Sequence, residues 1–242
     1  ENDKVIGLKV SIKTAEQIRK YSAGAQRNNA VYNFQDIIAV SSGMKLVKSE
    51  ARTAAASPAN VLITGESGTG KELFAQAIHN ASPRFAGPFV PISCGGFSRE
   101  TVDSILIGTE KNPGKFIQAD GGTLFLDGIS EMSQDMQSFL LRFLEDGIVT
   151  PIGSRRSVQT DVRVISAAGS EVLQKVKDGS FRLDLYYRLN VLRIDLPPLR
   201  ERQADMQELS NYFVTLLSAG YGKNISVSYT HLRAHETSQD LV

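Results

Sequence analysis

One segment constrains this chain more than any other: a short apolar strand, a glycine-rich loop and an amphipathic helix in direct succession. The strand is Val61–Thr64, and the loop that follows reads Gly65-Glu66-Ser67-Gly68-Thr69-Gly70-Lys71-Glu72. Glycines let successive backbone amides converge on an anion, and the helix start adds the positive end of its dipole. A lysine at the end of such a loop can reach the β- and γ-phosphates of a nucleotide, so residues 65–72 are candidate phosphate contacts.

A plain turn is the alternative interpretation, since many strand-to-helix turns use glycine only for its positive φ. The full spacing ending in Gly70-Lys71, placed between a strand and a helix, favours nucleotide binding over that alternative. This pattern normally has a serine or threonine after the lysine as a magnesium ligand. Here the residue is Glu72.

Short apolar strands alternate with helices over most of the chain. The expected strands are Val61–Thr64, Phe89–Ile92, Thr123–Asp127, Val162–Ala167 and Val191–Leu196. Apolar residues at three- and four-residue steps predict intervening helices at Glu72–His79 and Ser133–Glu145, and a further helix at Asp205–Leu217. Such alternation predicts an α/β fold with a mostly parallel five-stranded sheet covered by helices.

Composition excludes several classes of protein. The 242 residues are 41% hydrophobic and 22% charged with a net charge of +1, which is typical of a globular protein and gives no bulk attraction to nucleic acid or anionic lipid. No apolar run approaches the roughly 18 residues of a membrane span, and no signal peptide is evident, so we expect a cytoplasmic protein without membrane contact. The single cysteine, Cys94, cannot form an internal disulfide.

The two ends of the chain differ from its middle. Lys4–Ile12 reads as a strand and Thr14 as the cap of a helix, which we interpret as the end of a domain that begins upstream. From Ser226 onward the apolar residues follow neither the helical nor the strand period, and this segment is similar to a translated sequencing adapter. We therefore treat residues 226–242 as a non-native tail, with a frayed native terminus as the alternative.

The loop ending in Gly70-Lys71-Glu72 resembles that of the AAA+ central domain in bacterial sigma-54-dependent transcription activators, where glutamate after the lysine is usual. The resemblance runs from about Phe34 to Arg202 and rests on a series of motifs in order: Ala77-Ile78-His79-Asn80, Gly121-Gly122-Thr123-Leu124-Phe125-Leu126-Asp127, Leu140-Leu141-Arg142-Phe143-Leu144, Phe181-Arg182-Leu183-Asp184-Leu185-Tyr186-Tyr187-Arg188-Leu189 and Leu196-Pro197-Pro198-Leu199-Arg200-Glu201-Arg202. It implies a P-loop AAA+ nucleotide-binding domain at 33–202 and the start of a helical lid at 203–225. Residues 1–27 similarly resemble the end of a PAS-like sensor domain and its linker helix.

The resemblance also implies ligands, partners and roles. The cofactors would be ATP or ADP with Mg²⁺, and Asp127 matches the family's magnesium-binding aspartate. Arg182 and Arg188 match the arginine fingers that reach a nucleotide on a neighbouring subunit, with a pair of solvated surface arginines as the alternative. Partners of the intact protein would be further copies in a ring, RNA polymerase holoenzyme, and promoter DNA through a helix-turn-helix domain missing from this chain.

The hydrolytic residues of the family are in part replaced. The glutamate that polarises water is Gly128 here, and losing a positioned general base costs about 10²- to 10⁴-fold in rate. Glu131 is a possible substitute, which we disfavour because a side chain on a new backbone position seldom reproduces the geometry. The family usually has Ala-Thr-Asn as a γ-phosphate sensor, and Ala167-Ala168-Gly169 stands in its place here. We therefore expect binding to persist and hydrolysis to be impaired.

The loop that contacts sigma-54 in the family is also changed. Ile105–Phe116 occupies its place without the Gly-Ala-Phe-Thr-Gly-Ala motif and is too short to project it. This resembles a divergent subgroup without that loop, such as regulators of dihydroxyacetone and glycerol or of aromatic amino acid metabolism. The leading hypothesis is a regulatory domain whose nucleotide occupancy controls assembly. The alternatives are an active ATPase that remodels RNA polymerase holoenzyme and a nucleotide-free oligomerisation scaffold.

Two chemically reactive residue types have plainer interpretations. His79 lies in the helix after the loop, with no cluster of metal ligands at suitable spacing, so we expect a packed or capping histidine. Cys94 has no histidine near it in sequence and is expected to be a small buried residue rather than a nucleophile.

Overall fold

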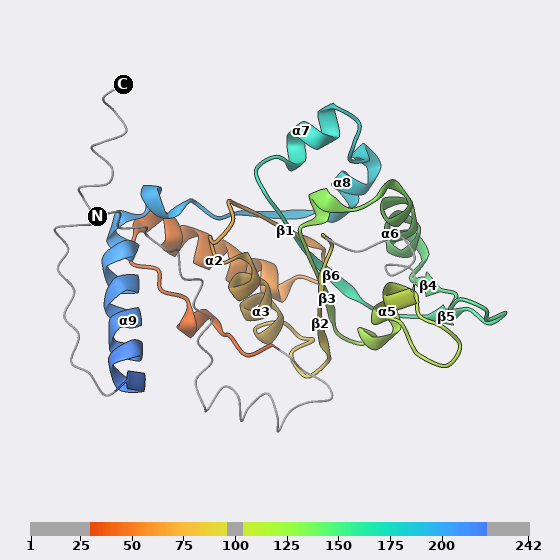
Figure 1. Cartoon of the computed structure of the whole chain (residues 1–242), viewed down its shortest axis with the longest axis horizontal. Coiled ribbons are helices and arrows are strands. Elements are labelled where there is room, and N and C mark those ends of the chain that lie inside the picture. Colours follow the sequence, from red (N-terminus) through yellow and green to blue (C-terminus); the bar gives the residue numbers. More distant parts are fainter. Residues whose placement is uncertain (1–29, 96–103, 222–242) are drawn as a thin grey trace, which may run out of the picture.

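The computed structural model describes residues 30–95 and 104–221 (Figure 1). The strand and helix expected within residues 1–27 and the tail at 226–242 lie outside these described residues. The elements that follow one another are η1 (Phe34–Asp36), α2 (Ser42–Ala56), β1 (Val61–Thr64), α3 (Lys71–Asn80), β2 (Phe89–Ser93), α5 (Lys115–Gln118), β3 (Thr123–Asp127), η2 (Ile129–Glu131), α6 (Gln134–Asp146), β4 (Ile148–Val149), β5 (Val158–Gln159), β6 (Arg163–Ala168), α7 (Val172–Lys177), α8 (Leu183–Leu189), β7 (Leu192–Asp195), η3 (Leu199–Glu201) and α9 (Gln203–Tyr221).

The main sheet is the predicted five-stranded one, with the order β2-β3-β6-β1-β7, and its neighbouring strands all pair in parallel. Every residue of β1 and β6 is buried, because helices cover both faces of these central strands. Each expected strand is present with its ends shifted by no more than two residues. The α/β fold prediction is confirmed.

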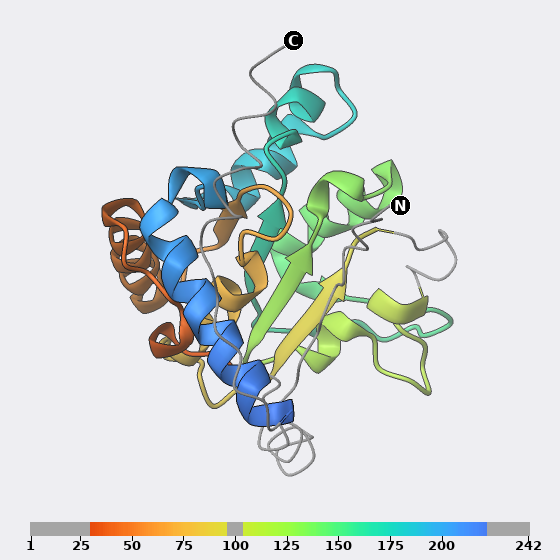
Figure 2. The ribbon, with the colours of Figure 1, turned by 60° about the vertical axis from the view of Figure 1, so that its left-hand side comes forward.

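Helices form a layer on each side of the sheet (Figure 2). One core cluster joins α2 and α3 to the sheet, with Met44, Phe74 and Ile78 fully buried. The other joins α5, α6, α7 and α8 to the opposite face and contains Phe116, Leu140 and Leu185. Burying two such apolar layers is the main source of stability for a fold of this kind.

Helix α9 is attached to the domain through a buried carboxylate at its start. Asp205 is 0% exposed and accepts hydrogen bonds from the amides of Val40 at 2.5 Å and Ser41 at 2.8 Å, and from the Ser41 hydroxyl at 2.6 Å. Ser41 also caps α2, since its hydroxyl oxygen accepts from the Met44 amide. The bonds join the beginning of α9 to the beginning of α2 across a long stretch of sequence.

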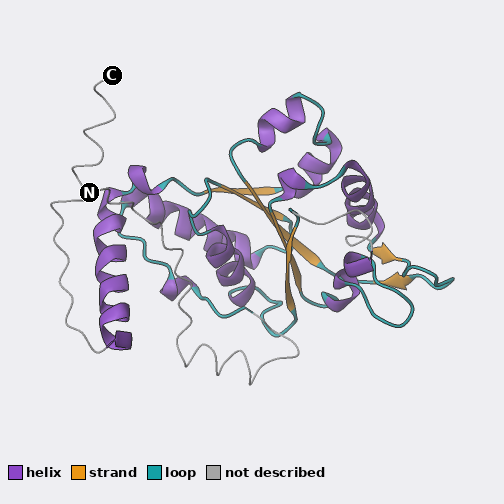
Figure 3. Ribbon diagram, in the orientation of Figure 1, coloured by secondary structure: helices purple, strands orange, loops and turns teal. Residues whose placement is uncertain are grey.

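A small hairpin extends from the domain beyond the end of α6 (Figures 1 and 3). Its strands β4 and β5 pair antiparallel and form a separate two-stranded sheet. The sequence interpretation did not foresee it, because strands of two residues show no periodicity.

Candidate functional site

The glycine-rich loop has the backbone that its sequence predicts. Gly68 has φ +80° and Gly70 has φ +100°, which are left-handed conformations that residues with a side chain rarely adopt. Gly70 is the N-cap of α3, so the helix begins at Lys71 and its first amides lie at the loop. At the other end, the Gly65 amide donates to the Ala168 carbonyl at 3.2 Å, which fixes the loop to the end of β6.

Lys71 and Glu72 have different surroundings. The Lys71 ammonium donates to the carbonyls of Gly65 and Glu66, both at 2.8 Å, so its positive charge lies against the loop. The Glu72 carboxylate instead accepts from the Gln76 side chain at 3.0 Å, one turn along α3. Among the expected phosphate contacts, Lys71 is therefore placed for an anion, whereas Glu72 is engaged along the helix.

Two arginines after β7 contact the loop, and the sequence interpretation did not assign them to the site. Arg200 forms two hydrogen bonds with Glu66, each at 2.7 Å, and these hydrogen bonds lower the pKa of the Glu66 carboxyl. Arg202 is 7% exposed and donates to the Thr69 carbonyl at 3.1 Å. The segment that leads into α9 thus holds both sides of the loop. Both arginines belong to the family motif at residues 196–202, but the motif alone did not indicate which residues they contact.

The end of β3 carries the expected acid and the expected departure from the family. Asp127 is the last residue of β3 and is exposed. Gly128 follows with φ +72° and ψ +44°, and its amide donates to the Ala167 carbonyl at 3.0 Å. A Cβ placed on Gly128 would meet only the Glu131 carboxyl, at 3.9 Å and beyond. The backbone here has a shape that suits glycine rather than glutamate.

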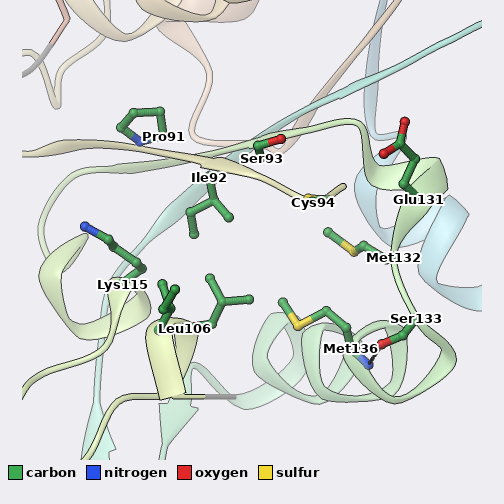
Figure 4. Close-up of a pocket in the computed structure, with 11 residues that line it drawn as sticks. Pro91, Ile92, Ser93, Cys94, Leu106, Lys115, Glu131, Met132, Ser133 and Met136 are labelled. Atoms are coloured by element: carbon green, nitrogen blue, oxygen red, sulfur yellow. Dashed lines mark hydrogen bonds between the residues drawn. The ribbon is translucent and has the colours of Figure 1, made fainter. Parts of the chain in front are cut away.

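The Glu131 carboxylate lies near two glycines, Gly95 just after the edge strand β2 and Gly128 at the end of β3. Its carboxylate oxygen is 1.8 Å from the position that a Cβ on Gly95 would take, just after β2. It lines a cavity of about 250 Å³ together with Cys94, Met132 and Met136, and it points away from the two methionines (Figure 4). The Glu131 carboxyl is thus about 4 Å from the position where a side chain on Gly128 would begin.

His79 fits the packing role expected for it, whereas Cys94 is only half-buried. Burial, with smaller contributions from Asp127 and Glu131, raises the pKa of the Cys94 thiol, which keeps it protonated and unreactive. His79 is 0% exposed, and its Nδ1 lies 2.8 Å from the Thr123 hydroxyl. Burial, followed by the nearby charge of Arg163, lowers the pKa of His79 to about 4.

The end of β6 brings an unforeseen carboxylate between the loop and the end of β3. Ala167 and Ala168 are buried, and Gly169 follows them without a polar side chain, as expected from the sequence. Two residues later, Glu171 accepts a hydrogen bond from the Ser130 hydroxyl at 2.7 Å. Nothing in the sequence pattern singled out Glu171, because the contact depends on the folding of two separate turns.

The two candidate arginine fingers lie at α8, which packs against α6 and β6: Arg182 is the N-cap of the helix and Arg188 is in its last turn. Arg182 is partly exposed and forms two hydrogen bonds with Asp184, at 3.0 and 2.7 Å, which raise the pKa of its guanidinium. Arg188 is exposed in the last turn of the helix. Both charges are therefore at the surface.

Residues 108–113, between β2 and β3, form a tight turn. Thr109 and Asn112 exchange backbone hydrogen bonds of 2.9 and 3.2 Å, and Gly108 pairs with Pro113. The Ile152 amide, from the hairpin, donates to the Gly108 carbonyl at 2.9 Å. These bonds hold residues 108–113 against the neighbouring hairpin.

Metal and membrane features are limited in the described part of the chain. Within residues 30–95 and 104–221, no group of three or more His, Cys, Asp or Glu side chains could hold a metal ion. The same ranges contain no helix that is long and apolar enough to cross a bilayer. Asp127, a single exposed carboxylate at a strand end, nevertheless suits Mg²⁺, which usually takes one or two carboxylates and completes its shell with phosphates and water.

Comparison with known proteins identifies relatives among transcription regulators. The chain is 42% identical over 235 residues to the signal-transduction and transcriptional-control protein of Clostridium beijerinckii, covering 93% of this chain and 37% of that protein. It is 44% identical over 212 residues to the HTH-type transcriptional regulatory protein TyrR of Salmonella typhimurium, covering 87% of this chain and 40% of that protein. The chain thus spans about two fifths of the length of these curated relatives.

Solved structures agree with the fold. NtrX from Brucella abortus in complex with ADP matches with a TM-score of 0.79 and 30% identity, covering 88% of this chain and 49% of that one. The same protein in complex with ATP matches with a TM-score of 0.76 and 31% identity, covering 86% and 47%.

The family model described as the sigma-54 interaction domain matches residues 37–195, well over half of the chain. The motifs noted in the sequence, the parallel sheet and the glycine loop between β1 and α3 all lie within or beside this range. The chain therefore belongs to the sigma-54 interaction domain family, with the P-loop AAA+ fold of transcription regulators.

Proposed function

We propose that this domain binds ATP or ADP at Gly65–Glu72 and that nucleotide occupancy controls the assembly of a transcription regulator, with little hydrolysis. The observation that carries the proposal is the loop itself: left-handed glycines at 68 and 70, the start of α3, and the Lys71 ammonium together at the end of β1. The NtrX structures with ADP and ATP support it, because they share this fold at 30% and 31% identity.

Mg²⁺ would be bound through Asp127 and the nucleotide phosphates, and its chemistry there would be to neutralise phosphate charge. The chain's own residues would supply the rest of the binding. The amides at the start of α3 would donate to the phosphates, and Lys71 would move its ammonium from the loop carbonyls to phosphate oxygens. Arg200 and Arg202 would keep the loop in place from the segment leading into α9.

Impaired hydrolysis is supported by two positions without a polar side chain, one just after β3 and one at the end of β6. Gly128 offers no carboxylate after Asp127, and the Ala168-Gly169 pair offers no sensor for the γ-phosphate. A positioned base contributes about 10²- to 10⁴-fold in rate, so we expect turnover to be lower by a factor in that range than in a relative that keeps the glutamate.

Coupling to sigma-54 is proposed to be weakened as well. Residues 108–113 form a tight turn bonded to the β4–β5 hairpin, which supports a loop that does not extend from the domain. We propose that the intact protein, acting in the cytoplasm, assembles into a ring through surfaces that include Arg182 and Arg188. It would then act on RNA polymerase holoenzyme at promoter DNA bound by a further domain.

Two measurements test this function on the purified chain. Isothermal titration calorimetry with ATP and with ADP is expected to show one saturable site, lost in Lys71→Ala. Steady-state phosphate release with Mg²⁺ is expected to stay near background. Absence of binding heat would favour the scaffold alternative, whereas Mg²⁺-dependent turnover that disappears in Lys71→Ala would favour the active ATPase.

A further inference from the structure

Glu171 lies just beyond the carboxyl end of β6, the middle strand of the sheet. It precedes α7 in the turn after β6, and β6 lies between β3 and β1 in the sheet. The Ser130 hydroxyl donates to its carboxylate at 2.7 Å, and Ser130 belongs to η2, the turn after Gly128. Glu171 therefore spans the ends of β6 and β3.

The carboxylate fills space that Gly169 leaves open. A Cβ placed on Gly169 would meet a Glu171 carboxylate oxygen, so a side chain at position 169 would require the Glu171 carboxylate to move. Gly169 and the loop residues Gly65 and Glu66 line one groove of about 240 Å³. The Gly65 amide is bonded to the carbonyl of Ala168, the residue before Gly169. Glu171 does not line this groove itself, but its carboxylate lies next to Gly169, which does.

The carboxylate of Glu171 is ionised in these surroundings. Its own backbone amide and the Ser130 hydroxyl lower its pKa, with smaller contributions from the charges of Lys175 and Lys71. Lys175 donates to the Ser130 carbonyl at 2.8 Å. A fixed negative charge is therefore present close to the lysine that would meet the terminal phosphates.

We propose that Glu171 is a specificity-determining residue that makes the site bind a nucleoside diphosphate more tightly than the corresponding triphosphate. This inference rests on the proposed nucleotide binding at Gly65–Glu72. Lys71 would meet the β- and γ-phosphates. A γ-phosphate would add negative charge near the ends of β3 and β6, which the Glu171 carboxylate spans. Because Glu171 is exposed to water, screening limits the penalty, and we expect it to weaken triphosphate binding by about 5- to 10-fold.

The test is a set of calorimetric titrations with ADP and with ATP, each with Mg²⁺, on the whole chain. Glu171→Gln removes the charge and keeps an oxygen that can accept from Ser130. Glu50→Gln is the matched control, because Glu50 is an exposed carboxylate on α2, the helix packed on the opposite face of the sheet from α7. We expect Glu171→Gln to tighten ATP binding by about 5- to 10-fold with ADP binding unchanged, and Glu50→Gln to change neither.

Three results would overturn the inference. The first is an ADP-to-ATP affinity ratio that is the same in Glu171→Gln as in the unaltered chain. The second is a loss of Mg²⁺-dependent phosphate release in Glu171→Gln without a change in ATP affinity, which would make Glu171 a general base. The third is absence of binding by either nucleotide to the unaltered chain, and only this third result would also refute the proposed nucleotide binding.

Discussion

Putting the family's glutamate back at position 128 should not restore a normal site. Gly128 has φ +72° and ψ +44°, and η2 begins at the next residue. A residue with a side chain pays roughly 1 to 2 kcal/mol to occupy this left-handed region. The space itself is open, since a Cβ there would come no closer than 3.9 Å to Glu131. The cost is therefore backbone strain, and Gly128→Ala isolates it.

Urea unfolding followed by circular dichroism measures this cost. We expect Gly128→Ala to lower the free energy of unfolding by about 1 kcal/mol and the Tm by about 2 to 4 °C. Gly43→Ala is the matched control, because Gly43 lies in α2 with nothing within 4 Å of its Cβ position and no positive φ. It should raise the free energy of unfolding by about 0.5 kcal/mol or more.

Hydrolysis gives the second measurement for position 128. Strain redirects the new side chain in Gly128→Glu, so we expect phosphate release to rise by less than about tenfold, well short of the roughly 10²- to 10⁴-fold effect of a positioned base. The reasoning is refuted if Gly128→Ala is as stable as the unaltered chain, or if Gly128→Glu turns over ATP a hundredfold faster or more.

The remaining predictions concern buried polar groups. Burial and Arg163 lower the pKa of His79 to about 4 in the folded chain, so the unfolded chain binds the proton first as the pH falls below 6.5. The stability that the neutral histidine contributes is therefore present above pH 6.5. It is lost as the pH falls toward 4, at about 1.4 kcal/mol per pH unit. Urea titrations at pH 7 and pH 5 should show a smaller difference for His79→Gln, and an equal difference would contradict this. Arg163 donates to the carbonyls of Ala54, Ala55 and Ala59 at 2.7, 3.3 and 3.1 Å, so Arg163→Met should cost about 3 kcal/mol, and a loss under about 1 kcal/mol would show that those carbonyls find other donors. Asp205→Ala should lower the free energy of unfolding by about 2 to 4 kcal/mol and reduce amide-exchange protection in α9, because two backbone amides lose their acceptor. The control Glu208→Ala, at an exposed position of the same helix, should change the free energy of unfolding by no more than about 0.5 kcal/mol. Similar losses in both variants would contradict the special role of Asp205.

Local patterns predicted the features that are contiguous in sequence. The apolar runs of β1 and β6 and the glycine spacing of the loop each lie within a few residues, so the five strands and the backbone of Gly68 and Gly70 could be anticipated. Arg200, Arg202 and Glu171 could not be assigned, because each contacts a segment brought close only by the order of strands in the sheet. The same reason explains Asp205, whose partners Val40 and Ser41 precede it by more than 160 residues.

The replacement of the family's glutamate by glycine shows the limit of motif comparison more clearly. Sequence comparison identified Gly128 as a missing side chain. The structure adds that its backbone is left-handed and bonded to Ala167, so the change involves the shape of the turn as well as the lost carboxylate. A side chain can be read from a sequence, whereas the backbone angle that a glycine adopts depends on its neighbours in space.

A crystal structure of this chain grown with ADP and Mg²⁺ tests the nucleotide site most directly. The expected result is a diphosphate in the loop, with the amides of residues 68–71 donating to its oxygens and the Lys71 ammonium moved from the carbonyls of Gly65 and Glu66 onto phosphate. A nucleotide bound elsewhere, or a loop without one at saturating concentration, would contradict it.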